Sequence, residues 1–150
     1  MKLLIRDSHA RNPISPALAC RWAQKVVRAV KGAAFERQCE LSVVFTGDAE
    51  VRKMNRLYRK KDKTTDVLAF PLREGKLLRA GLPGSGALGD VMISVPQTLR
   101  QAKAAGKKPK EEMALLLTHG ILHLLGFDHV TLRQEKRMFG LQNRLVKKLV

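Results

Sequence analysis

Residues 113–129 read MALLLTHGILHLLGFDH, and this stretch decides the predicted architecture. The segment before Gly126 is apolar on nearly every side, which is typical of a helix buried in a protein core. His119 and His123 stand four residues apart, so they share one face of that helix with Cβ atoms about 5–6 Å apart. Gly126 offers the left-handed residue with which helices commonly end, and the chain can then turn and return His129 to the same place.

Three imidazoles in this pattern predict a metal site. Histidine nitrogens bind zinc at about 2.0–2.1 Å, and three protein ligands leave a fourth position open, as in catalytic rather than structural sites. The spacing equals that of one metalloprotease motif, in which a glutamate after the first histidine acts as general base. Gly120 occupies that position here and has no side chain. Metal-assisted hydrolysis therefore remains, whereas peptide hydrolysis by that mechanism is excluded.

Charge and composition indicate the class of partner. The chain has 29 basic and 13 acidic residues and a net charge of +16, which favours nucleic acid over an anionic membrane surface. We expect no membrane partner, because no apolar run approaches the roughly 20 residues of a membrane span, and the N-terminus does not resemble a secretory signal. Cys20 and Cys39 match no zinc spacing and are expected to be free thiols, as in a cytoplasmic protein.

The remaining sequence predicts a single domain over residues 1–150. Short apolar runs at residues 3–5, 41–45, 67–70 and 89–94 are typical of strands. Helices are predicted to begin near residues 16, 48, 96, 109 and 131, and a glycine-rich loop is predicted over residues 73–87. The predicted fold class is α+β (mixed α/β): a small, mostly four-stranded sheet packed with about five helices, with the histidine helix buried at its centre.

Three blocks carry a resemblance to a known family. Residues 58–71, 88–94 and 119–129 read YRKKDKTTDVLAFP, LGDVMIS and HGILHLLGFDH, and together they closely resemble the YbeY family of bacterial metal-dependent endoribonucleases. The blocks occur in family order within about residues 40–130. The chain departs from the family at Thr64 and Ala69, where proline and serine are common, and in its basic C-terminal segment, which is acidic in many relatives.

The resemblance implies a function and a set of site residues. It makes His119, His123 and His129 the ligands of one zinc ion per chain, and Arg59 the functional arginine facing it across a basic cleft. The implied activity is single-strand-specific endoribonuclease cleavage in 16S rRNA 3′-end maturation and ribosome quality control. The implied partners are RNA, chiefly rRNA or precursor rRNA, and in addition the ribosomal subunit or assembly proteins.

Several roles stay open at this level. Asp128 is a candidate for moving a proton or for orienting a ligand histidine, and Asp66 is a candidate for orienting Arg59. The alternative function is that of a non-catalytic rRNA-binding ribosome assembly factor with a structural metal, against which the open coordination position argues. A metallopeptidase or other small-molecule hydrolase would fit the histidines, but it explains neither the charge nor Gly120.

Overall fold

The fold is built around one mixed four-stranded sheet. A computed structural model describes residues 1–72 and 86–150, so the loop predicted over residues 73–87 lies almost wholly outside the described residues. The strand order is β1-β2-β4-β3, in which the first three strands are parallel and β3 runs antiparallel to β4. The strands are β1 (Lys2–Asp7), β2 (Glu40–Thr46), β3 (Val67–Pro71) and β4 (Ala87–Ser94).

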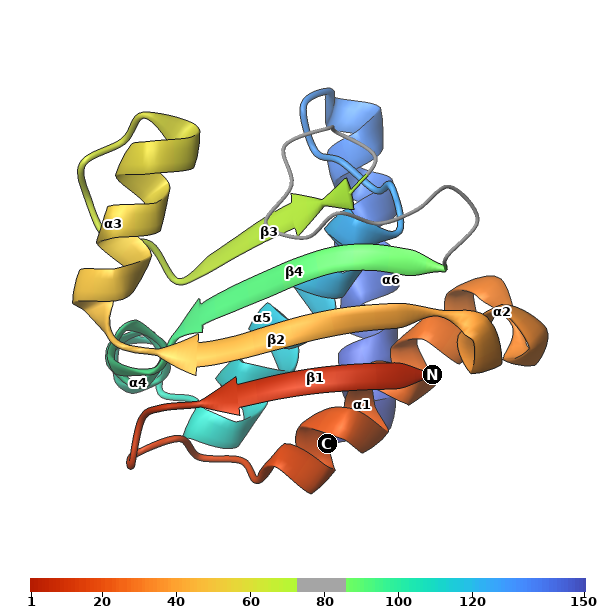
Figure 1. Cartoon of the computed structure of the whole chain (residues 1–150), viewed down its shortest axis with the longest axis horizontal. Helices are drawn as coiled ribbons and strands as arrows, with labels where there is room; N and C mark the ends of the chain where they lie inside the picture. Colours follow the sequence, from red (N-terminus) through yellow and green to blue (C-terminus); the bar gives the residue numbers. More distant parts are fainter. Residues whose placement is uncertain (73–85) are drawn as a thin grey trace.

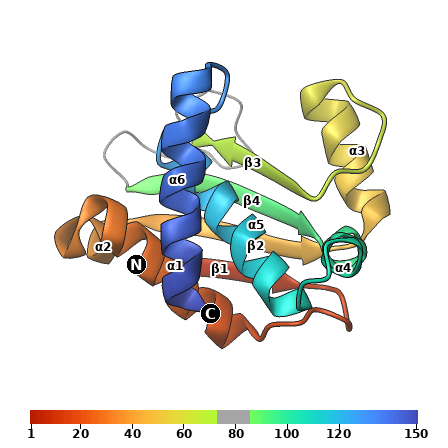
Figure 2. The same cartoon turned by 180° about the vertical axis from the view of Figure 1, so that it is seen from behind.

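Helices cover the two faces of this sheet unequally. Figures 1 and 2 show α1, α5 and α6 behind the sheet, α3 on the opposite face beside β3, and α4 at the end of the strands. The described residues form six helices: α1 (Pro16–Lys31), α2 (Ala33–Gln38), α3 (Asp48–Arg59), α4 (Val95–Ala104), α5 (Pro109–Leu124) and α6 (Leu132–Leu149). The predicted α+β domain with a four-stranded sheet is confirmed.

The prediction missed α2, the shortest helix. Gly32 ends α1 with φ of 89°, a left-handed value that favours glycine and redirects the chain. The helix that follows has only six residues, fewer than two turns, and so it is too short to display a helical period.

The main core lies between the sheet and α5. Met113, Leu117, Ile121 and Leu122 of this helix are fully buried, as the apolar sequence predicts. A smaller apolar cluster on the other face joins α3 to β3 and β4 through Val51, Leu68, Phe70 and Met92. The β3–β4 half of the sheet is therefore held from both sides.

Gly120 sets how closely α5 approaches the sheet. A Cβ atom added there would lie 2.6 Å from Cγ1 of Val91 and 3.3 Å from Cγ2 of Val67. Val91 is fully buried in β4 and its branched side chain has few alternative positions. Gly120 is thus a close-packing position, and a glutamate there would not fit beside the strand.

A hydrogen-bond network anchors the basic segment that precedes β3, residues 60–66. Oδ1 of Asp48 accepts from the hydroxyls of Ser94 at 2.7 Å and Thr64 at 3.2 Å, and Oδ2 accepts from Arg100 at 2.8 Å. Burial raises the pKa of Asp48, but the hydrogen bonds from Ser94 and Arg100 outweigh it and hold that pKa below its ordinary value. An ionised carboxylate therefore ties α3, the end of β4 and the segment before β3 together.

The close approach at Gly120 predicts the effect of one methyl group. Gly120→Ala should lower the free energy of unfolding by about 1–3 kcal/mol, because the added atom overpacks α5 against β4. The measurement is urea unfolding followed by circular dichroism. The matched control is Gly140→Ala in α6, where the new Cβ meets only Arg144 at 3.7 Å and should stabilise the helix by about 0.5–1 kcal/mol. Equal effects of the two substitutions would contradict the packing argument.

Candidate metal centre

The three histidines predicted as metal ligands converge on one point. One ring nitrogen from each of His119, His123 and His129 lies within 4.8 Å of the other two. The Nε2 atoms of His119 and His123 are 3.1 Å apart. Two nitrogen ligands of a tetrahedral zinc ion, with bonds of about 2.05 Å, lie about 3.3 Å apart. The donor set and its spacing therefore fit a metal ion.

A turn at the end of α5 delivers the third histidine. Gly126 has φ of 99°, and its N–H donates to the carbonyl of His123 at 3.0 Å. The N–H of Phe127 donates to the carbonyl of Leu122 at 3.0 Å, which completes a Schellman motif. Oδ1 of Asp128 accepts the backbone N–H of His129 at 2.7 Å. Asp128 thus shapes the turn that carries His129.

Two residues of α6 support the histidines, and the sequence analysis missed both. Oε1 of Gln142 lies 2.8 Å from Nδ1 of His119. The ring of Phe139 stacks on His129 at 5.9 Å between centroids and lies 6.2 Å from His119. Gln142 falls among apolar positions on the buried face of its helix, four residues after Met138. A polar residue on an apolar stripe was the signal that would have identified it.

Burial favours the neutral, metal-binding form of two histidine rings, those of His119 and His123. Burial lowers the pKa of His123 to about 4, and the neighbouring His119 and His129 add to this effect. Burial also lowers the pKa of His119, partly offset by the hydrogen bond with Gln142. Neutral imidazoles bind metal ions without first losing a proton.

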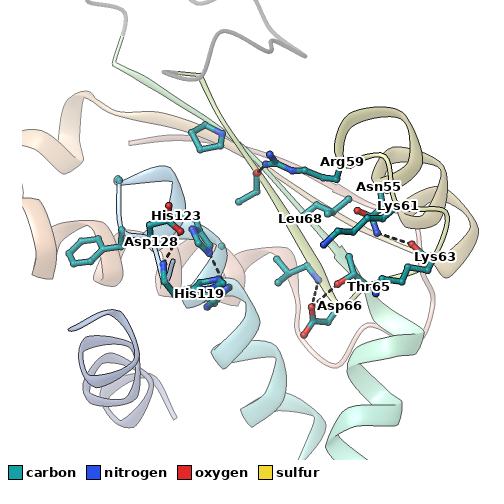
Figure 3. A pocket seen from close by; sticks show the side chains of 17 residues that line it. Asn55, Arg59, Lys61, Lys63, Thr65, Asp66, Leu68, His119, His123 and Asp128 are labelled. Atoms are coloured by element: carbon teal, nitrogen blue, oxygen red, sulfur yellow. Dashed lines mark hydrogen bonds between the residues drawn. The ribbon is translucent and has the colours of Figure 1, made fainter. Parts of the chain in front are cut away.

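A cavity of about 720 Å³ joins the histidines to the basic segment. Figure 3 shows His119, His123 and Asp128 on one side of it, with Arg59, Lys61 and Lys63 on the other. The guanidinium of Arg59 donates to the carbonyl of Ala69 at 2.6 Å and lies over the Phe70 ring, 5.4 Å from its centroid. The volume falls within the range of small-ligand sites and suits a short segment of a polymer.

Asp66 lines the same cavity, but its hydrogen bonds lead elsewhere. Oδ1 accepts from the backbone N–H of Val67 at 2.8 Å and the hydroxyl of Thr65 at 3.2 Å. Oδ2 accepts from the amide of Gln101 at 3.3 Å. These bonds fix the start of β3 against α4. The contacts of Arg59 include the β3 carbonyl and the Phe70 ring, and a role for Asp66 in orienting Arg59 stays a prediction.

Two further expectations concern the rest of the chain. Cys20 and Cys39 are free thiols, as predicted. Among the described residues no helix has the length and apolar character needed to span a membrane.

Comparison with known proteins places the chain in a family. The family model described as Endoribonuclease YbeY matches residues 5–150. The chain belongs to the YbeY endoribonuclease family. It is 49% identical over 107 residues to Endoribonuclease YbeY of Myxococcus xanthus. These 107 residues are 71% of this chain but only 35% of that longer protein. It is 40% identical to the protein of the same name from Staphylococcus saprophyticus, over 74% of this chain and 72% of the relative.

A solved structure supports the fold. The solution structure of TM1509 from Thermotoga maritima matches with a TM-score of 0.64 and 22% identity, covering 98% of this chain and 88% of that one. The named relatives are RNA-cleaving hydrolases, which confirms the expected enzyme class.

The histidine geometry predicts a measurable metal affinity. Zinc at 100 times its dissociation constant should raise the free energy of unfolding of the wild-type chain by about 2.7 kcal/mol. His123→Ala should lose this stabilisation, because one of three converging nitrogens is removed. Calorimetric titration and thermal unfolding with and without zinc provide the measurement. His9→Ala, which changes the one histidine outside the cluster, is the control and should bind zinc as the wild type does.

Proposed function

We propose that this chain is a metal-dependent endoribonuclease that cleaves single-stranded RNA in the cavity between the three histidines and Arg59. The observation that carries the proposal is the convergence of three imidazole nitrogens within 4.8 Å at one wall of a cavity whose other wall is basic. Metal-assisted hydrolysis requires metal ligands such as the three histidines, and the basic residues opposite them suit a polyanionic substrate. The family relationship supports RNA as that polyanion.

The proposed metal is zinc, held by His119, His123 and His129. A zinc ion there would supply Lewis-acid polarisation of a phosphoryl oxygen and a lowered pKa for its water ligand. The planar guanidinium of Arg59 would bind the scissile phosphate through paired hydrogen bonds. Phe70 and the Ala69 carbonyl hold this side chain at the β3 edge, so it meets the substrate with little further loss of rotamer freedom.

The proposed substrate is precursor rRNA, with action in 16S rRNA 3′-end maturation and in ribosome quality control. The family resemblance supports this finer assignment, together with contacts to the ribosomal subunit or assembly proteins. A single-stranded RNA segment, whose bases are free of a duplex, suits a cavity of this size.

The competing function is a non-catalytic rRNA-binding assembly factor. In that case the metal would serve only to hold the turn after α5. The three-histidine donor set favours the enzyme, because structural zinc sites are closed by four protein ligands and usually contain cysteine. Both cysteines of the chain lie outside the histidine cluster.

Cleavage of a defined RNA separates these two functions. The purified chain should cut RNA that spans the 3′ end of precursor 16S rRNA. Cleavage should stop when a chelator is added and resume when zinc is restored. Metal-free His123→Ala should leave the RNA intact, whereas His9→Ala should cut normally. If metal-stripped His123→Ala cuts as well as the metal-loaded wild type, the mechanism is wrong. RNA bound but never cut by the wild type would favour the assembly factor.

Arg59 should matter to cleavage and not to the metal. Arg59→Ala is expected to lower cleavage about 10²–10³-fold, as removal of one donor to developing charge does elsewhere. Arg59→Lys should recover part of the lost cleavage, because lysine keeps the positive charge but lacks the paired N–H donors of the guanidinium. Zinc content by mass spectrometry should stay at the wild-type value. Arg56→Ala, an exposed arginine on the same helix, is the control and should change cleavage little.

Helix α6 adds a second basic surface close to the cavity. Six of its exposed residues are basic and fall within an arc of roughly 120°, given 100° per residue. They are Arg133, Lys136, Arg137, Arg144, Lys147 and Lys148. Arg137 lies over the ring of Phe127, 5.4 Å from its centroid, and Phe127 lines the cavity. An RNA strand leaving the cavity would meet this row of charges.

Salt dependence tests whether RNA uses α6. The triple variant Arg133→Gln, Lys136→Gln and Lys147→Gln should weaken RNA binding and reduce the slope of log K against log salt by about 2, at roughly 0.7 per phosphate contact. Arg21→Gln, Lys25→Gln and Lys31→Gln on α1 remove the same charges from another exposed surface. The α1 triple variant is expected to weaken RNA binding and reduce the salt slope less than the α6 triple variant does. Fluorescence anisotropy at several salt concentrations measures both, and equal slopes would contradict a path along α6.

A further inference from the structure

Helix α6 contributes no histidine to the metal centre, yet it contacts two of the three rings. Gln142 is 7% exposed, and its Oε1 lies 2.8 Å from Nδ1 of His119. Phe139, one turn earlier on the same helix, stacks against His129 at an interplanar angle of 30°. The rings are thus held from α6 as well as from α5.

The distance to Gln142 matters because a neutral imidazole has one N–H and one lone pair. The Nε2 atom of His119 points at the other ligands, since it lies 3.1 Å from Nε2 of His123. A metal there needs the lone pair on Nε2, so the proton of His119 belongs on Nδ1. The carbonyl oxygen of Gln142 is placed to accept that Nδ1–H.

We infer that Gln142 is a positioning residue for the metal centre: it holds His119 in the Nδ1–H tautomer and fixes the angle of its ring. The inference rests on the proposed function, because it requires a metal at the three histidines. Partners of this kind on ligand histidines typically change metal affinity 10–100-fold when they are removed.

The structure distinguishes this role from the one considered for Asp128. The carboxylate of Asp128 accepts from the backbone of His129, so it acts on the path of the chain. Gln142 contacts a ring nitrogen directly from another helix. As a neutral amide it orients the imidazole without adding negative charge, which leaves the charge of the ion available to an anionic substrate.

The first test reads the tautomer in the metal-free full chain. Long-range ¹H–¹⁵N correlation spectra should show His119 of the wild type protonated at Nδ1. In Gln142→Leu the acceptor is lost, and the Nε2–H form should become the major one. An unchanged tautomer in this variant, or Nε2–H in the wild type, would overturn the inference.

The second test measures zinc affinity by competition with a chelator. Gln142→Leu should weaken binding 10–100-fold, whereas Gln142→Glu, which keeps an acceptor, should stay within threefold of the wild type or bind more tightly. Asn143→Leu makes the same amide-to-apolar change at the next, exposed position of α6 and should have no effect. Affinity in Gln142→Leu within twofold of the wild type would overturn the inference.

These outcomes separate the inference from the proposed function. If the wild type binds no zinc, the proposed function fails and the inference fails with it. If the wild type binds zinc and cuts RNA while Gln142→Leu binds as tightly, only the inference fails. Should Gln142→Leu not fold, Gln142→Asn, whose amide is one carbon shorter, should show the same weakened binding, and wild-type affinity in it would overturn the inference.

Discussion

The centre of this molecule depends on the close approach of α5 to β3 and β4 at Gly120. A single added methyl group would lie 2.6 Å from a buried valine, so the helix lies too near the sheet for a residue larger than glycine at this position. The histidines on either side of this contact, at 119 and 123, are therefore held beside the β3 edge. That edge also carries the carbonyl that binds Arg59. One packing constraint thus brings both walls of the cavity together.

The candidate metal centre combines local and long-range support. The Schellman turn at Gly126 and the Asp128 hydrogen bond deliver His129 within a dozen residues of His119. Gln142 and Phe139 reach the same rings from α6, after the chain has turned back. Burial lowers the pKa of His119 and His123, which favours the neutral form of both rings near neutral pH. Packing and chemistry act together here, because the buried environment that stabilises the fold also prepares the ligands.

The basic wall is held by different means. Asp48 binds Ser94, Thr64 and Arg100, and the amide of Asn55 donates to the carbonyl of Lys63 at 2.9 Å. These bonds position residues 60–66 without using the lysine side chains, and Lys61 and Lys63 line the cavity. The cavity thus has three histidines on one side and basic residues on the other, an arrangement suited to a polyanion.

Most secondary-structure elements could be predicted from the sequence alone, because local rules govern them. The strands, the five longer helices and the meeting of the three histidines were all predicted. Periodicity, capping residues and the helix end at Gly126 are local signals that extend over one or two helical turns. The six-residue helix α2 left no periodic signal. The partners of the site were decided by tertiary structure: Gln142 for His119, Ala69 for Arg59, and Val67 and Gln101 for Asp66. Hydrogen bonds between distant segments form only after packing has set which side chains meet, and no spacing along the sequence records that.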